Sequence, residues 1–174
     1  NAGQEAGVRA RDRLRVGVAD ALRALGTGFL SHRDNDALRR ALQQEDGLTR
    51  QAFFEELLGL VYRLIFLATV EDRTDVSTGQ PLIFTPDSPD DARQRYLAGY
   101  SLTWLRERAV RRSSFDTHSD LWQALTITFD ALARGEAALG LPALGGLFDR
   151  EQCTHLDAAQ IENRWLLEAV SYLG

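Results

Sequence analysis

The apolar run between Thr49 and Arg73 constrains the fold more than any other feature of the chain. Its apolar residues form two neighbouring stripes at helical spacing. The first stripe is Phe53, Leu57, Leu60, Leu64 and Leu67, and the second is Phe54, Leu58, Val61, Ile65 and Ala68. Together they cover more than half of the helix circumference, which is wider than a helix on a protein surface needs. We therefore expect a central helix from Thr49, as N-cap, to about Arg73, packed on several sides.

Apolar residues spaced by three and four recur on both sides of this run. We expect the first helix to end at Gly26 and Gly28 and the second to end at Gly47, because glycine commonly terminates helices. The first of these helices is expected at residues 4–25 and the second is a short one capped by Asp34 or Asn35. Beyond the central helix we expect helices at 92–112 with a break near Gly99, at 119–133, and a last one from Asp157 or Gln160 to Leu173. No repeat and no alternation of strands with helices is present. The sequence therefore predicts an all-α fold, an irregular bundle of five to seven helices.

The helical pattern is interrupted by a long polar segment near residues 74–89, rich in Asp, Ser, Thr, Gly and Pro. We expect one long loop there, with a short strand at residues 82–84. A loop of this length is unusual in a compact domain and tends to be functional or mobile. A second irregular, glycine-rich connection is expected from Gly135 to Arg150.

The length of the chain, 174 residues, suits one domain with a substantial core. We expect a single helical domain at residues 3–174, with Asn1 and Ala2 as a tag remnant, and a fragment of a larger multidomain protein; a mature, processed protein is the alternative. No apolar run reaches the roughly 20 residues that cross a bilayer. The single cysteine, Cys153, excludes an internal disulfide, and a cytoplasmic location is the default expectation.

The charge pattern limits the classes of partner. All 20 basic residues are arginine, a usage typical of a GC-rich bacterial genome, and the net charge is −5. A free-standing nucleic-acid-binding protein usually carries a basic surplus, so this balance disfavours that class. Local contact with phosphate stays open, because arginines cluster near the N-terminus, at Arg9, Arg11, Arg13 and Arg15, and again at Arg106, Arg108, Arg111 and Arg112.

The sequence contains no complete catalytic or nucleotide-binding motif. A phosphate-binding loop and a nuclease carboxylate–lysine pair both require lysine, which is absent. His32, His118 and His155 lie far apart, and we expect them to be solvated residues of loops or helix ends. Cys153 lies near His155, but the surrounding polar sequence shows no partner that would orient a thiol nucleophile. The acidic group Asp87, Asp90 and Asp91 is explained by the dipole of a helix that starts there.

Two features depart from an ordinary helical pattern. Arg63 stands among apolar residues in the central helix, so it must find a carboxylate or carbonyl partner. We expect Arg63 and Glu71 or Asp72 to tie this helix to its neighbours; contact with nucleic acid or another domain is the alternative. The stretch Gly140 to Asp149 combines paired glycines with Leu147 and Phe148, which describes a tight loop that buries two side chains.

These stretches carry a family likeness. Four stretches resemble, in order and spacing, stretches of type IIG restriction–modification and phage-exclusion N6-adenine DNA methyltransferases. They are Leu57 to Arg73, which ends in Glu-Asp-Arg, Tyr100 to Arg106, Leu121-Trp122, and Leu139 to Asp149. Leu144 stands where that family more often has Asn. The likeness covers roughly residues 50–174.

The resemblance implies that this chain is the helical region preceding the methyltransferase domain. The whole enzyme would methylate N6 of adenine in DNA with S-adenosylmethionine, through an Asn-Pro-Pro-Tyr motif, and some members also carry a nuclease. Neither that motif nor the nuclease residues occur here, so no catalytic, cofactor-binding or metal-binding residue carries over. The implied role is a non-catalytic scaffold whose partner is the methyltransferase domain of the same chain, with no membrane partner.

The residues that we select as candidate contacts with DNA or with another domain are Arg63, Arg73, Arg106, Arg108, Arg111 and Arg112. Two other functions stay open at this point. One is an independent helical protein–protein interaction module, which the acidic balance favours. The other is a weak DNA-binding domain, which the arginine groups favour.

Overall fold

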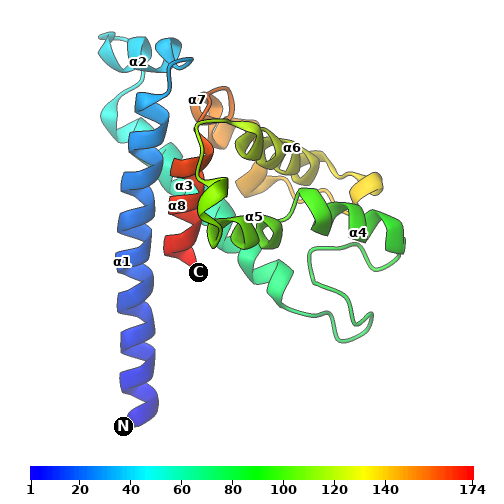
Figure 1. Ribbon diagram of the computed structural model, residues 1–174. Coiled ribbons are helices and arrows are strands. Elements are labelled where there is room, and N and C mark those ends of the chain that lie inside the picture. The colour runs from blue at the N-terminus through cyan, green and yellow to red at the C-terminus, as the bar shows by residue number, and fades with distance from the viewer.

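The computed structural model describes residues 1–174 and consists of helices and loops without a strand (Figure 1). The helices are α1 (Ala2–Ser31), α2 (Asp36–Gln43), α3 (Arg50–Asp72), α4 (Asp90–Gly99), α5 (Leu102–Ala109), α6 (Asp120–Arg134), α7 (Thr154–Asp157) and α8 (Asn163–Leu173). Seven of them have eight residues or more, and α7 is a single turn. The predicted all-α bundle of five to seven helices is confirmed.

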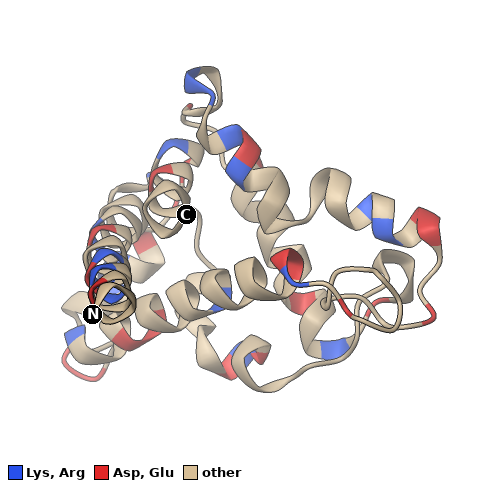
Figure 2. Ribbon diagram, turned by 90° about the horizontal axis from the view of Figure 1, so that it is seen from below, with Lys and Arg blue, Asp and Glu red and all other residues tan.

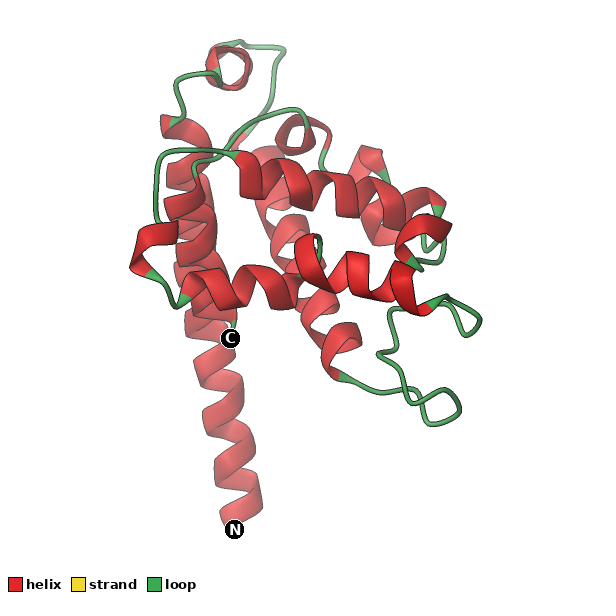
Figure 3. Cartoon of the chain, turned by 45° about the vertical axis from the view of Figure 1, so that its right-hand side comes forward, coloured by secondary structure: helices red, strands yellow, loops and turns green.

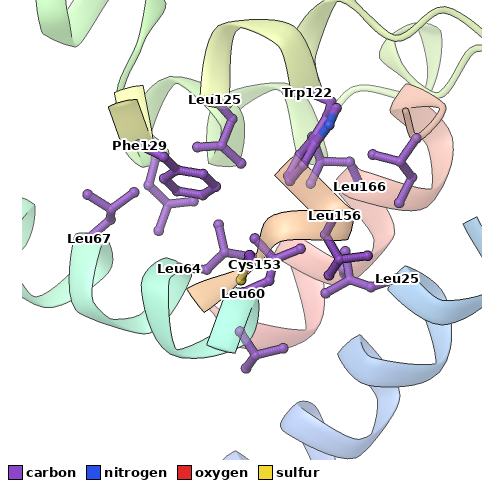
Figure 4. Close-up of a cluster of buried hydrophobic side chains, with 14 of the residues drawn as sticks. Leu25, Leu60, Leu64, Leu67, Trp122, Leu125, Phe129, Cys153, Leu156 and Leu166 are labelled. Carbon is purple, nitrogen blue, oxygen red and sulfur yellow. The ribbon is translucent and has the colours of Figure 1, made fainter. Parts of the chain in front are cut away.

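Helix α3 is the central helix, as the apolar run predicts. Thr49 caps it, because its hydroxyl accepts a hydrogen bond from the backbone amide of Ala52 at 3.0 Å. The helix contacts α1, α5, α7 and α8, and its leucines at 60, 64 and 67 are almost fully buried. Figure 4 shows these leucines facing Trp122, Leu125 and Phe129 of α6 and Leu156 of α7. The width of the apolar surface is therefore matched by neighbours on several sides.

The expected end of the first helix at Gly26 and Gly28 is wrong, since α1 continues to Ser31. The reason is packing against α8. A Cβ atom on Gly28 would lie 2.6 Å from Trp165 Cβ in α8 and 2.6 Å from Ile161 Cδ1 just before α8, so glycine allows a close approach of α1 to this part of the chain. The intrinsic cost of glycine in a helix, about 1 kcal/mol, is outweighed here by tertiary contacts.

The long loop lies between α3 and α4, as predicted, but the short strand at residues 82–84 is wrong. Residues 82–84 form a turn, and the only ladder contact nearby is an isolated bridge between Thr74 and Pro81. Ile83 and Phe84 are buried, and the amide of Ile83 donates to the carbonyl of Val70 at 3.0 Å. Their apolar side chains anchor the loop to the core instead of forming a sheet.

The remaining boundaries differ in detail from the expected ones. The break near Gly99 is confirmed, but α5 ends at Ala109 and is followed by the short 3-10 helix η1 (Arg112–Ser114). The last predicted helix, from Asp157 or Gln160 to Leu173, corresponds to α8, which starts later, at Asn163, and the single turn α7 precedes it. The start of α8 is set by contacts with the α5–α6 connection, because the amide of Asn163 donates to the carbonyl of His118.

The first half of α1 stands away from the rest of the molecule (Figures 1 and 3). Its second half packs along α8, whose end at Leu173 reaches the middle of α1. Residues 8–16 of α1 are all exposed, whereas Gly17 is buried. None of the helices combines the length and the apolar character that a bilayer crossing requires.

Candidate functional site

Arg63 of α3 lies fully inside the protein, with 0% of its surface exposed. Its Nε donates to the carbonyl of Leu147 at 2.8 Å and its Nη2 to the carbonyl of Asp149 at 3.0 Å. Its Nη1 donates to both carboxylate oxygens of Asp157, at 3.0 and 3.3 Å. Arg63 therefore ties α3 to neighbouring segments of the chain, as expected. The selection of Arg63 as a DNA contact is corrected, since its donors are turned to loops of its own chain.

Aromatic rings complete the environment of Arg63. Its guanidinium carbon lies 4.8 Å from the centroid of Phe129 and 5.9 Å from that of Phe148. Burial raises the pKa of Asp157, although the neighbouring charge of Arg63 acts in the opposite direction. Arg63 thus holds the glycine-rich segment and α7 against α3 through one carboxylate and two carbonyl groups.

Glu71 performs the equivalent task at the other end of α3. Its Oε2 accepts hydrogen bonds from the hydroxyl of Tyr96 at 2.6 Å and the amide of Leu102 at 2.9 Å. Its Oε1 accepts from the amide and the hydroxyl of Thr103, at 2.8 and 2.7 Å. Burial, followed by the charge of Glu71, raises the pKa of Tyr96 well above its ordinary value. Glu71 therefore fixes the first turn of α5 and the last part of α4.

Three further buried polar side chains also bind the backbone of distant segments, and the sequence patterns did not reveal them. Glu56 accepts from the amides of His155 and Leu156, at 2.8 and 3.1 Å, and so caps α7. Asn35 exchanges hydrogen bonds with the backbone of Gln160. Asn163 accepts from the amide of Leu121. We call Asn35, Glu56, Arg63, Glu71 and Asn163 the buried clamp residues.

The histidine and cysteine expectations are corrected in part. His32 is buried rather than solvated, with Nε2 at 2.9 Å from the hydroxyl of Ser119. His155 lies 2.7 Å from the carboxylate of Glu56 through its Nδ1. Cys153 has 0% of its surface exposed and donates to the carbonyl of Glu56. Figure 4 shows its sulfur among leucines of α3, so the polar surroundings expected for it are wrong.

Burial raises the pKa of Cys153 to about 12, partly opposed by the charge of Arg63. The unfolded chain loses the thiol proton near pH 9, whereas the folded chain keeps it. Stability from this group is therefore complete below about pH 9 and lost as the pH rises towards 12. We expect the free energy of unfolding to fall by about 1–2 kcal/mol between pH 8 and 10.5 from this source. Urea denaturation at both values measures it, and Cys153→Ala should flatten the decline; an equally steep decline in that variant would contradict the assignment.

The four arginines Arg106, Arg108, Arg111 and Arg112 lie at the end of α5 and on η1, and we call them the α5 arginine face. Figure 2 shows blue, basic segments close together at the upper edge of the molecule. Arg106 pairs with Asp72 at 3.2 Å. Arg108 stacks on Trp104, with its guanidinium carbon 3.7 Å from the ring centroid.

Arg111 and Arg112 are exposed and make neither an ion pair nor a side-chain hydrogen bond. They directly follow Val110, which is 85% exposed, and Arg112 and Phe115 form part of the wall of a shallow hollow. Arg73 is also exposed, directly after α3. The structure thus brings Arg106, Arg108, Arg111 and Arg112 together on one surface and separates Arg63 from them. The position of basic residues in the last turn of α5 also suits the helix dipole.

The acidic residues expected at the start of α4 behave as dipole partners and local ion pairs. Asp90 pairs with Arg93 and Asp91 with Arg95 within the helix. No group of three or more His, Cys, Asp or Glu side chains is placed to hold a metal ion. A groove of about 560 Å³ opens between α6 and α7, where Asp157 and Phe129 form part of its wall. Its other carboxylate, Asp130, is paired with Arg134 and Arg150.

Comparison with known proteins adds no relative: no family model, no curated protein and no solved structure matches this chain.

Proposed function

We propose that this chain is a non-catalytic helical scaffold domain of a DNA restriction–modification enzyme that methylates N6 of adenine. The observation that carries the proposal is that three of the four stretches that resemble that family contact one another. Arg63, in the first stretch, binds the carbonyl groups of Leu147 and Asp149 in the last one. Glu71, also in the first stretch, binds the amides of Leu102 and Thr103 in the middle one.

The buried positions of the charged side chains and their contacts with backbone groups support a scaffold role. Arg63 and Glu71 are both buried and directed at backbone groups, so neither is presented to a substrate. The other buried clamp residues likewise bind backbone groups of loops and helix ends. Such contacts hold irregular segments in one arrangement, which a domain that positions a neighbouring methyltransferase domain requires. S-adenosylmethionine would then bind in that neighbouring domain.

The coding sequence provides the test. The same open reading frame is expected to encode, after this segment, a glycine-rich cofactor loop and an Asn-Pro-Pro-Tyr motif. A reading frame without them would overturn the assignment and favour an independent interaction module. Titration of this chain with S-adenosylmethionine in a calorimeter is expected to show no heat of binding, and saturable binding would contradict the non-catalytic role.

A second role within this proposal is contact with DNA phosphates through the α5 arginine face. The specific observation is that Arg111 and Arg112 are exposed and make no ion pair, so their charges are available to phosphate groups without breaking internal contacts. The net charge of −5 opposes binding elsewhere on the surface, and we expect the affinity to be weak and strongly dependent on salt.

Replacing Arg111 and Arg112 together with alanine is expected to abolish retention of the chain on duplex DNA at about 50 mM salt. Two lost phosphate contacts should also reduce the slope of log K against log salt by about 2. Electrophoretic mobility shift measured over a salt series tests both effects. The matched control is Arg33→Ala with Arg40→Ala, which removes the same charge from exposed positions near α2. Equal losses in the two double variants would show that only net charge matters.

A further inference from the structure

The chain turns from α5 into η1 around a shallow hollow that has apolar and basic residues in one wall. The hollow has a volume of about 610 Å³, within the range of small-ligand sites, and its lining residues are Ala109, Val110, Arg112 and Phe115. Val110 is 85% exposed, whereas Phe115 is half-buried and packs against the hydrophobic core. An apolar surface open to solvent therefore adjoins the exposed arginines of the α5 arginine face. We call it the α5–η1 hollow.

Hydrogen bonds hold this turn in one shape. The amide of Phe115 donates to the carbonyl group of Arg112 at 3.1 Å. The next residue, Asp116, is tied to α8, because its carboxylate accepts from Nδ2 of Asn163 at 2.8 Å and its carbonyl group accepts from the amide of Arg164 at 3.0 Å. The carboxylate of Asp116 is thus committed to an internal donor rather than to the nearby arginines. The hollow is preformed, so a ligand that enters it does not have to order the turn.

A ligand that suits this surface combines an anion with an adjoining apolar or planar group. Arg111 and Arg112 have no carboxylate partner in the chain, so their charges are complementary to an anion from outside it. Arg112 also forms part of the hollow, so the group bonded next to that anion would reach Val110 and Phe115. Aromatic rings and guanidinium groups are the surfaces on which unpaired nucleobases stack. A phosphate with its nucleoside has the required combination.

We infer that the α5–η1 hollow takes an unpaired base of single-stranded DNA whose phosphates contact Arg111 and Arg112. The inference rests on the proposed contact of the α5 arginine face with DNA, and it names the form of DNA that this face selects. In a duplex the bases are paired and stacked inside the helix, so arginines bound to its phosphates would leave the hollow empty. In a single strand a base is free to leave the stack and enter the hollow. Cationic and aromatic side chains together bind single strands in this way, with little dependence on sequence.

Fluorescence anisotropy with labelled oligonucleotides at about 50 mM salt tests the inference. A single strand is expected to bind at least about fivefold more tightly than a duplex of the same length, and than a single strand in which abasic sites replace the bases. Phe115→Leu keeps an apolar side chain but removes the ring, and should abolish most of this difference. Val110→Ser, at an exposed position that folding does not need, should reduce it about twofold. The matched control is Ile127→Ser on α6, where the apolar side chain is 53% exposed.

The outcomes separate the role of the hollow from the proposed contact with DNA. Duplex binding that depends on Arg111 and Arg112, without a preference for the single strand, would overturn the role of the hollow alone. An abasic strand bound as tightly as the complete one would do the same. Binding of neither form of DNA would overturn the DNA contact and the inference with it. Displacement of the single strand by an acidic peptide of alternating glutamate and leucine, at lower concentration than by unlabelled single strand, would assign the hollow to a protein partner instead.

Discussion

Arg63→Met is expected to lower the free energy of unfolding by about 3–5 kcal/mol, a large part of the 5–15 kcal/mol typical of a domain. Methionine keeps an unbranched apolar side chain but removes the guanidinium group and its four hydrogen bonds to Leu147, Asp149 and Asp157. The carboxylate of Asp157 is then left partly buried without its cation, and two loop carbonyl groups lose their donor. Urea denaturation followed by circular dichroism measures the change.

Two comparisons make this prediction specific to the buried ion pair. Adding Asp157→Asn to Arg63→Met should restore part of the stability, because it removes the unpaired charge. Arg106→Met breaks the pair with Asp72 at the surface, where the two side chains are 30% and 62% exposed, and should cost less than about 1 kcal/mol. An Arg63→Met variant no weaker than Arg106→Met would refute the structural role of Arg63.

The fold could be predicted from the sequence where a local pattern decides the structure. The two apolar stripes of α3 and the Thr49 cap are local features, and both the helix and its central position follow from them. The stop assigned to Gly26 and Gly28 failed because a glycine serves equally for termination and for close packing. Only the position of α8, which is set by tertiary contacts, decides between these uses. The strand at residues 82–84 failed for the same reason, since Ile83 and Phe84 are anchors whose partners are distant in sequence.

The candidate site divides in the same way. That Arg63 needs an internal partner follows from its apolar neighbours, and the structure bears this out. The sequence does not identify the partners of Arg63. Asp157 lies far along the chain, and every residue has a backbone carbonyl group, so the sequence pattern does not distinguish those of Leu147 and Asp149. Glu56 gave no signal, since a glutamate in the first turns of a helix is ordinary. The α5 arginine face, in contrast, is compact in sequence and could be identified directly.

Glu71→Gln is expected to lower the free energy of unfolding by about 3 kcal/mol, because one carboxylate serves four donors. An amide presents one oxygen as acceptor and turns its NH2 group towards a donor, so at least one buried donor of Tyr96, Leu102 or Thr103 loses its partner. The negative charge at the first turn of α5, favourable to the helix dipole, is lost as well. Urea denaturation at pH 7 measures the effect.

The decisive evidence is coupling between Glu71 and Tyr96 rather than the size of the loss alone. If the carboxylate and the phenol act through their 2.6 Å hydrogen bond, Tyr96→Phe should cost less in the Glu71→Gln background than in the unchanged protein. Glu107→Gln, on the exposed side of α5, is the control and should change stability by less than about 0.5 kcal/mol. Additive losses from Tyr96→Phe and Glu71→Gln would mean that Glu71 stabilises α5 alone. The link from α3 through Glu71 to α4 would then have to be abandoned.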